Sequence, residues 1–286
     1  MDALGGFTDA LYRAHQTAWA AWVRRRRRAD FDAVRRFCLF VGYPRSGHSV
    51  VGAFLNAHKH AVIAHELNVP PLVLAGCTRD ELYARILTRA RWFHLRGDRS
   101  NHDYRVPHQW QGRYERLDVI GDKRGGAVTR CLAEHPDFFD RVRALVGVPL
   151  RLVHVVRHPL DNIAAISIWH RLSLEESVAY YFMHCATTAR LDAFCAPDEL
   201  CSVRHEAMIE DPRAVLTRLC AFLGLELHPG YLDDCCRVVF PRTTATRQKV
   251  RWPVGLVAEV ERKARAYPFL DGYRFEVSEG GPDSRR

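Results

Sequence analysis

The chain has 286 residues, of which 48% are apolar and 26% are charged. These proportions are typical of globular proteins and exclude a disordered or collagen-like chain, and the length suits one α/β domain with a long insertion. The formal net charge of +9 favours an anionic partner such as phosphate, sulfate, nucleic acid or an acidic lipid surface, without choosing among them. The nine cysteines are scattered and form no CxxC pair, which favours reduced thiols over disulfides and argues against a structural zinc site.

The first 34 residues predict an amphipathic helix and a basic turn. Five arginines at residues 24–28 follow apolar residues at helical spacing, namely Leu4, Phe7, Leu11, Trp19 and Trp22. Polar residues interrupt this apolar stretch and the basic run comes after it, so we expect neither a signal peptide nor a transmembrane helix, and hence a cytoplasmic protein. Packing of the helix on its own domain is the simpler interpretation, and peripheral contact of residues 1–28 with a membrane surface is the alternative.

Beyond residue 34, apolar runs alternate with helical patterns. The predicted strands are short apolar runs typical of buried parallel strands, at residues 37–41, 117–120 and 150–156. The predicted helices lie at residues 49–57, 79–95, 173–195 and 212–224. We therefore expect a single α/β domain over residues 35–276, with a central, mostly parallel sheet flanked by helices, and a disordered tail at 277–286.

The loop from Gly42 to Ser49, between the first strand and the next helix, has the features of a phosphate-binding loop. Gly42 and Gly47 allow a tight turn whose N–H groups point inward, and the helix start adds its partial positive charge. The spacing is P-loop-like, but a Walker A loop needs lysine where this chain has His48. Arg45 supplies a planar, permanently charged group from another position, so the loop favours phosphate or sulfate without the kinase lysine.

This loop resembles the 5′-phosphosulfate-binding loop of sulfotransferases that use 3′-phosphoadenosine-5′-phosphosulfate (PAPS). The resemblance rests on the sequence Tyr43-Pro44-Arg45-Ser46-Gly47. The family pattern continues with two hydroxyl residues, where this chain has His48 and then Ser49. The resemblance implies that PAPS is the co-substrate and is bound by Pro44, Arg45, Ser46, Gly47, His48 and Ser49. It also implies in-line transfer of a sulfuryl group to an acceptor hydroxyl of a small molecule or glycan.

A second element, residues 155–162, follows an apolar strand and enters a helix. Arg157 lies at the carboxyl end of the predicted strand, where open α/β sheets bind their ligands. The segment resembles the family's 3′-phosphate motif, which implies that Arg157 binds the 3′-phosphate. The family places a serine or threonine eight residues after this arginine, where this chain has Ala165.

A third basic group precedes the last helical pattern and comprises Arg247, Lys249 and Arg251. It is similar in kind and position to a basic loop with which family members close over the 3′-phosphate. Composition alone fits a solvated run of charge equally well, and which of the three side chains points inward stays open.

Sulfuryl transfer needs a base for the acceptor proton and cations for the leaving phosphate, but no obligatory metal. Glu66 resembles the glutamate that follows the first helix in sulfotransferases of the tyrosylprotein type, which implies that it is the base. His65 is the alternative base. Asp122 and Lys123 resemble an acidic residue and lysine that the family places after a strand, so Lys123 is expected to reach the sulfuryl group or the acceptor.

Two other functions remain as alternatives. A P-loop kinase would use Asp122 as a Walker B residue, but its phosphate-binding lysine is missing. A basic nucleic-acid or membrane-surface binding protein would explain the net charge but not the phosphate elements, so we expect no nucleic-acid partner. We expect no metal either, because no regular element brings His58, His60 and His65 together. The polar segment 96–116 is expected to form a loop beside the acceptor site.

Overall fold

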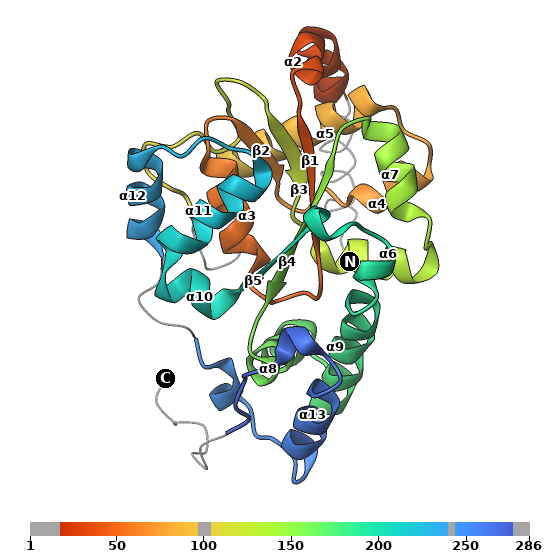
Figure 1. Ribbon diagram of the computed structural model, residues 1–286, viewed down its shortest axis with the longest axis vertical. Helices are drawn as coiled ribbons and strands as arrows, with labels where there is room; N and C mark the ends of the chain where they lie inside the picture. The colour runs from red at the N-terminus through yellow and green to blue at the C-terminus, as the bar shows by residue number, and fades with distance from the viewer. Residues whose placement is uncertain (1–17, 97–103, 240–243, 277–286) are drawn as a thin grey trace, which may run out of the picture.

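The computed structural model describes residues 18–96, 104–239 and 244–276 (Figure 1). Its strands are β1 (Arg36–Val41), β2 (Ala61–Ala64), β3 (Val119–Asp122), β4 (Leu150–Val156) and β5 (Leu200–Arg204). Residues 18–26 are also helical, and the further helices are α2 (Arg28–Asp32), α3 (His48–Ala57), α4 (Val69–Leu74), α5 (Arg79–Arg96), α6 (Gly125–Glu134), α7 (Phe138–Val146), α8 (Pro159–His170), α9 (Leu174–Thr188), α10 (His205–Glu210), α11 (Pro212–Leu223), α12 (Pro229–Val238) and α13 (Leu256–Ala264). Short 3-10 turns are η1 (Leu191–Ala193), η2 (Pro197–Glu199), η3 (Thr246–Lys249) and η4 (Pro268–Leu270). No helix within these ranges is long and apolar enough to cross a membrane.

In the described part of the chain, the strands form a five-stranded sheet of order β2-β3-β1-β4-β5, in which every pair is parallel. The predicted α/β fold with a central parallel sheet is therefore confirmed. From β1 the chain first forms the edge strand β2, returns to β3 between β2 and β1, and then crosses to β4 on the other side of β1. Such a reversal opens a crevice at the carboxyl ends of the central strands, where ligands bind in open α/β sheets. We call the edge formed by these carboxyl ends the site edge.

Helices cover both faces of the sheet, as the apolar strands require. On one face, Phe54 of α3, Leu216 of α11 and Tyr231 of α12 pack on Phe40 and other buried strand residues. On the opposite face, α4, α5, α6 and α7 supply a second buried cluster. Figure 1 shows α11 and α12 on one side of the strands and α6 and α7 on the other. This layered packing is what the alternation of apolar runs and amphipathic helices in the sequence predicts.

A third apolar cluster lies beyond the site edge and joins α8, α9 and α13. It buries Tyr43 of the phosphate loop against Tyr181 of α9, with ring centroids 4.6 Å apart. Figure 1 shows these three helices gathered below the carboxyl end of β4. The cluster matters for the site because it anchors one side of the phosphate loop in a packed core.

Two predicted boundaries were wrong, each for a tertiary reason. β3 runs from Val119 to Asp122 rather than over 117–120, because the Asp122 carboxylate is buried and accepts two backbone N–H bonds, so a charged residue belongs to the strand. α9 has the predicted capping box at Ser173 but ends at Thr188 rather than 195. Beyond it the chain turns so that Leu191 packs in a different apolar cluster from the one that α9 lines.

The polar segment after α5 only partly borders the site edge. Tyr104 lies close enough to Arg157 to act on the pKa of its guanidinium, in the upward direction. Further along, Trp110 N–H donates to the Ala57 carbonyl and Glu115 N–H donates to the Lys59 carbonyl, both at the amino end of β2. The segment therefore runs away from the site edge, because its backbone groups are satisfied at the opposite edge of the sheet. Residues 97–103 of this segment, residues 1–17 of the N-terminal helix and the predicted tail at 277–286 lie outside the described residues.

Candidate active site

The phosphate loop forms a tight turn between β1 and α3. The backbone has positive φ angles at Gly42, Arg45 and Gly47, of 110°, 67° and 102°. A Cβ on residue 47 would lie 2.3 Å from Nδ1 of His205, so the turn and the close approach both require glycine there. The N–H of Gly42 donates to Oγ1 of Thr129 at 2.7 Å, which ties the loop to α6. The first N–H groups of α3 follow Gly47, and a helix start of this kind attracts anions.

Two side chains of the loop differ in their surroundings. Ser46 is fully buried, and its hydroxyl has no hydrogen-bond partner among the described residues. The guanidinium of Arg45 lies over the indole of Trp169 in α8, with 4.3 Å between Cζ and the ring centroid. Non-glycine residues with positive φ angles are uncommon and strained, and they occur in tight turns and cluster at active sites, so the backbone conformation of Arg45 is consistent with a functional turn.

His48 points back into the protein. Its Nε2 donates to the Val41 carbonyl at 3.1 Å, and its ring packs edge-on against Phe40. Burial, together with the nearby Lys123 ammonium, lowers the pKa of His48 to about 3, so the imidazole is neutral at physiological pH. The side chain therefore links the start of α3 to the end of β1.

Arg157 emerges from the end of β4 and joins three parts of the site edge. Its guanidinium donates to the Arg45 carbonyl at 3.2 Å, to the Thr244 carbonyl at 2.9 Å and to Oγ1 of Thr246 at 2.7 Å. Burial lowers the pKa of this guanidinium, and Asp161 and Glu206 oppose the shift by their charge. A buried cation held mainly by neutral acceptors is suited to an anionic ligand.

The side chains of the C-terminal basic group differ, since one forms an ion pair and two are exposed to solvent. Arg247 donates to Asp161 of α8 from its backbone N–H at 2.7 Å and from its guanidinium at 2.6 Å. Lys249 and Arg251 are exposed. The structure therefore brings the predicted loop to the start of α8, where the Arg247 side chain pairs with a carboxylate.

Lys123 connects the phosphate loop with Glu66. Its ammonium donates to Oγ of Ser49 at 2.8 Å and to Oε1 of Glu66 at 2.9 Å. The stem of Lys123 passes against Gly52 of α3, where a Cβ would lie 2.9 Å from Cβ of the lysine, so the ammonium reaches the edge from a buried position. Three predicted site residues from separate segments of the chain thus meet in one hydrogen-bonded group.

The Glu66 carboxyl has a strongly shifted pKa. Partial burial raises this pKa, but the charge and hydrogen bond of Lys123 outweigh burial and lower it to about 2. The side chain keeps 47% of its surface exposed, so a ligand can approach the carboxylate from solvent. At neutral pH the group is ionised, which is the form that a base requires.

Asp122 holds the turn that presents Glu66. Its two carboxylate oxygens accept the N–H groups of Leu67 at 2.9 Å and Asn68 at 3.1 Å. Burial raises the pKa of Asp122 to about 6, against the effect of these hydrogen bonds. Glu66 and Asn68 both have positive φ angles, 59° and 71°, and such strained conformations persist only where surrounding contacts determine them.

The remaining histidines of the sequence pattern are separated. His65 stacks on Phe93 of α5, with ring centroids 3.7 Å apart. His58 and His60 lie before β2, at the opposite edge of the sheet, where Nε2 of His58 donates to the Glu226 carbonyl at 2.8 Å. Within the described ranges, no group of three His, Cys, Asp or Glu side chains is arranged to hold a metal ion.

Several residues near the site were not singled out from the sequence. Nδ2 of Asn162 donates to the Pro44 carbonyl at 2.9 Å, and His205 packs on Gly47. Asn162 lies in the Arg157 motif and His205 directly follows β5, so position after a strand was the available signal. The contact between Thr246 and Arg157 joins residues 89 positions apart, and no local pattern predicts it.

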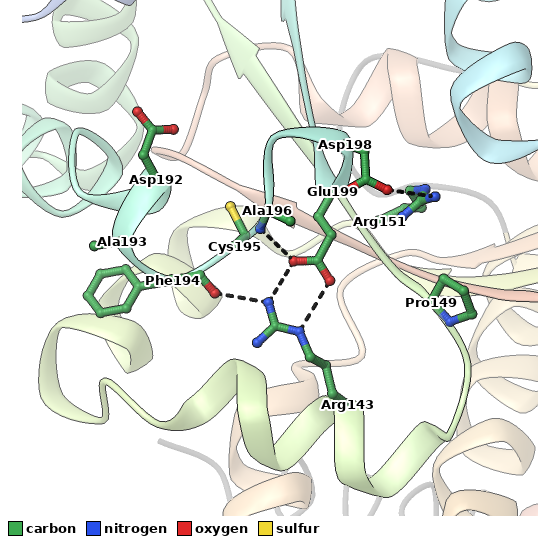
Figure 2. A pocket seen from close by; sticks show the side chains of 10 residues that line it. All are labelled: Arg143, Pro149, Arg151, Asp192, Ala193, Phe194, Cys195, Ala196, Asp198 and Glu199. Carbon is green, nitrogen blue, oxygen red and sulfur yellow. Dashed lines mark hydrogen bonds and ion pairs between the residues drawn. The ribbon is translucent and has the colours of Figure 1, made fainter.

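A cavity of ≈ 550 Å³ lies at the other edge of the sheet, around the starts of β4 and β5. Figure 2 shows Arg143 reaching both carboxylate oxygens of Glu199 and the Phe194 carbonyl, at distances of 2.7 to 3.2 Å. These groups satisfy one another, and the cavity is remote from the phosphate loop. It is therefore not the candidate active site.

A comparison with protein families gives the identity of this arrangement. A family model described as the sulfotransferase family matches residues 39–229, which is more than half of the chain and includes the phosphate loop, Glu66, Lys123 and Arg157. The chain belongs to the sulfotransferase family. The family consists of PAPS-dependent transferases, so membership implies PAPS as the co-substrate. A comparison with curated protein sequences finds no match.

Solved sulfotransferase structures share the fold at low sequence identity. Sulfotransferase STF9 from Mycobacterium avium is 13% identical, with 90% of this chain and 81% of that chain covered and a TM-score of 0.51. The sulfotransferase domain from the curacin biosynthetic pathway is 15% identical, with coverage of 82% and 98% and a TM-score of 0.50. These likenesses confirm the sulfotransferase fold and carry no information on the acceptor.

The residues around the phosphate loop fit a sulfated nucleotide. Buried polar atoms without a hydrogen-bond partner among the described residues include Oγ of Ser46, Oδ1 of Asn162 and Nδ1 of His205, all beside the loop. Buried polar groups are normally satisfied, so these atoms are candidates for contact with a ligand. The Ser46 hydroxyl and the cations of Arg45, Lys123 and Arg157 are donors that suit an anionic ligand such as PAPS, whereas Oδ1 of Asn162 can only accept a hydrogen bond.

Proposed function

We propose that this sulfotransferase moves the sulfuryl group of PAPS to an acceptor hydroxyl by in-line displacement, with Glu66 as the base. The observation that carries the proposal is the position of the Lys123 ammonium, 2.8 Å from Ser49 Oγ and 2.9 Å from Glu66 Oε1. Lys123 thereby joins a side chain of the phosphate loop to a carboxylate that is open to solvent. In this proposal Lys123 can therefore contact both the base, Glu66, and a sulfuryl group bound at the phosphate loop.

The nucleotide-binding roles follow from the loop. The N–H groups at the start of α3, including that of His48, and the hydroxyls of Ser46 and Ser49 bind the 5′-phosphosulfate. Arg45 stabilises the charge that grows on the leaving 5′-phosphate oxygen. Arg157 binds the 3′-phosphate, and the loop of Arg247, Lys249 and Arg251 closes over it. Support comes from the burial of Arg157 and from its bonds to Thr244 and Thr246 at the start of that loop.

The transfer is balanced in bonds and protons. Glu66 accepts the proton of the acceptor hydroxyl while the acceptor oxygen forms its bond to sulfur. The bond between sulfur and the 5′-phosphate oxygen breaks, and adenosine 3′,5′-bisphosphate leaves with its charge held by Arg45 and Lys123. The geometry favours Glu66 over His65 as the base, because the His65 ring is stacked on Phe93.

The ion pair with Lys123 also tunes the base. In the pair, the ammonium holds the Glu66 pKa at about 2, which makes the carboxylate a weak base. When Lys123 turns toward the oxygens of the sulfuryl group, it stops lowering this pKa, while partial burial continues to raise it. The proton affinity of Glu66 then increases when the transferable group is in place.

The kinase alternative has less support. Asp122 would be its Walker B residue, but both of its carboxylate oxygens accept N–H bonds from the turn after Glu66. Calorimetry with adenosine 3′,5′-bisphosphate and with Mg-ATP separates the two functions, and incubation with PAPS carrying labelled sulfur tests transfer to acceptors in a cell extract. We expect tighter binding of the bisphosphate and labelled hydroxyl compounds, small molecules or glycans. Tighter binding of ATP would contradict the proposal.

We also propose that residues 18–28 contact an anionic membrane surface. Ala20 and Val23 of this helix are buried, whereas Trp19 and Trp22 keep 38% and 47% of their surface exposed. The two indoles stack with centroids 4.8 Å apart, and the Arg26 guanidinium lies 5.9 Å from the Trp22 ring. Packing of the helix on its own domain explains the burial of Ala20 and Val23, but it does not explain the exposure of Trp19 and Trp22. Exposed tryptophan beside arginine is typical of side chains at a membrane interface.

The surrounding charge supports this contact. A cavity of ≈ 650 Å³ beside the helix is lined by Arg24, Arg25, Arg28, Thr78, Arg79 and Asp80. Glu81 and Asp80 pair with some of these arginines, but Arg25 forms no ion pair with any residue that the structure describes. The helix precedes β1 and so lies at the amino end of the sheet (Figure 1), which leaves the site edge facing away from the membrane.

A further inference from the structure

Trp169 is a large apolar side chain that the hydrophobic core does not explain. It lies in the last turn of α8 and keeps 56% of its surface exposed. Its ring faces the guanidinium of Arg45 at 4.3 Å. At this distance a cation and an indole attract each other through the ring quadrupole. The contact with the cation of the phosphate loop therefore explains why a tryptophan is present at this exposed position.

The same helix also holds the backbone of the phosphate loop. Nδ2 of Asn162 donates to the Pro44 carbonyl, and Arg157, just before α8, donates to the Arg45 carbonyl. Asn162 and Trp169 are seven residues apart in α8, so they lie on one face of the helix, about two turns from each other. One helix and its entry therefore contact the carbonyls of both peptides that flank Arg45, and also the side chain of Arg45.

Stacking leaves the chemistry of Arg45 intact. A guanidinium stacks through its flat face, while its N–H donors point outward in the plane of the group. A stacked arginine can thus still donate to the oxygens between phosphorus and sulfur. The indole restricts the rotamers of this long side chain, and a catalytic donor is effective only when it is held near its productive geometry.

We propose that Trp169 is a positioning residue that orients the Arg45 guanidinium toward the transferred sulfuryl group. This inference rests on the proposed function, since it assigns Arg45 to the leaving phosphate oxygen. Trp169 acts through Arg45 and does not itself take part in the reaction. Its loss should therefore reduce turnover more than it reduces nucleotide binding.

The first test compares turnover with nucleotide affinity. In Trp169→Leu, we expect kcat to fall about threefold to thirtyfold, the range that an exposed to partly desolvated cation–π contact supplies. The Kd for adenosine 3′,5′-bisphosphate, which lacks the sulfuryl group, should change less than about twofold. Trp169→Phe keeps a ring face and should lose less. Ile168→Ala is the matched control, because Ile168 is the adjacent residue and is equally exposed.

A double-mutant cycle tests whether the effect passes through Arg45. If it does, Trp169→Leu causes no further loss of kcat in an Arg45→Ala background. Independent losses that multiply in the double variant would overturn the proposal. Equal kcat in the wild type and Trp169→Leu would overturn it as well.

Tryptophan emission tests the contact without any turnover. Removing the guanidinium in Arg45→Ala should change the emission of the wild-type chain, and the same substitution should leave the emission of Trp169→Phe unchanged. An emission change that persists in the Trp169→Phe background would contradict the contact. If the wild type transferred no sulfuryl group, the proposed function would fail, whereas the emission result would still decide whether Trp169 holds Arg45.

Discussion

Lys123 and Glu66 form an ion pair at 2.9 Å in which the ammonium is buried and the carboxylate is half exposed. The two residues follow the carboxyl ends of the neighbouring strands β3 and β2. The pair keeps Glu66 ionised, and the same ammonium donates to Oγ of Ser49. This arrangement leads to the first two predictions.

Glu66→Gln should remove a base and leave the nucleotide site intact. We expect kcat to fall by about 10²–10⁴-fold, the usual contribution of general base catalysis, with less than a twofold change in the Kd for adenosine 3′,5′-bisphosphate. Initial rates with PAPS and calorimetry measure the two quantities. Glu115→Gln is the control, since Glu115 is an exposed glutamate that pairs with Lys59. Normal turnover in Glu66→Gln would contradict this assignment and would favour His65 as the base.

Lys123→Met should shift the acid limb of the pH profile to higher pH. Without the ammonium, burial is the main influence left on the Glu66 carboxyl, so its pKa rises from about 2 and the base becomes protonated at a higher pH. We also expect kcat to fall by about 10²–10³-fold, as when a transition-state donor is removed. The measurement is kcat/KM against pH, with Lys59→Met as the control. An acid limb that stays in place would show that Lys123 does not tune Glu66.

Arg157→Ala should chiefly weaken nucleotide binding. Hydrogen bonds to charged groups contribute about 1.5–3 kcal/mol, which corresponds to about a 10- to 150-fold increase in Kd for adenosine 3′,5′-bisphosphate. Adenosine 5′-monophosphate, which lacks the 3′-phosphate, should bind both proteins almost equally. Arg141→Ala is the control, because Arg141 is an exposed arginine paired with Asp137. If the bisphosphate and the monophosphate lost affinity equally, Arg157 would not be the residue that binds the 3′-phosphate.

His48 should make the fold sensitive to acid. Its pKa is about 3 in the folded protein and about 6.5 when unfolded, so below pH 6.5 the unfolded chain binds a proton that the folded chain does not. The stability that this group contributes is present above pH 6.5 and is lost as pH falls toward 3. His48→Thr should therefore flatten the pH dependence of unfolding between pH 7 and 5 by up to about 1.4 kcal/mol per pH unit. Urea titrations measure this slope, and an unchanged slope would contradict the burial of a neutral imidazole.

The exposed tryptophans should mediate membrane binding. Flotation with acidic and with neutral vesicles should recover the wild type only on the acidic ones. We expect Trp19→Ala combined with Trp22→Ala to reduce the bound fraction. Arg25→Gln should weaken binding about fivefold, because each arginine near an anionic surface contributes about 1 kcal/mol. Trp169→Ala is the control, as an exposed tryptophan near the site edge. Equal flotation of all variants would reject the contact, and binding of random DNA instead of vesicles would favour a nucleic-acid surface.

Short-range features of the site were readable from the sequence. The run from Gly42 to Ser49 predicts a strand, a tight turn and a helix start, because glycine positions and neighbouring apolar residues determine the local backbone. Arg157 was identified in the same way, from its place at the end of an apolar strand. The family resemblance of these two segments led to the sulfotransferase fold, which the family match confirms.

Only the tertiary structure decided how these segments meet. Lys123 and Glu66 are 57 positions apart, and their ion pair depends on the order of the strands in the sheet. His48 replaces a hydroxyl in the family pattern, yet its side chain bonds to Val41, because the space behind the loop is buried. Arg45 was recognised as the loop cation, but its contact with Trp169 arises from the packing of α8 beside the loop. Local sequence patterns specify backbone conformation, whereas the partners of a charged side chain depend on contacts between distant segments.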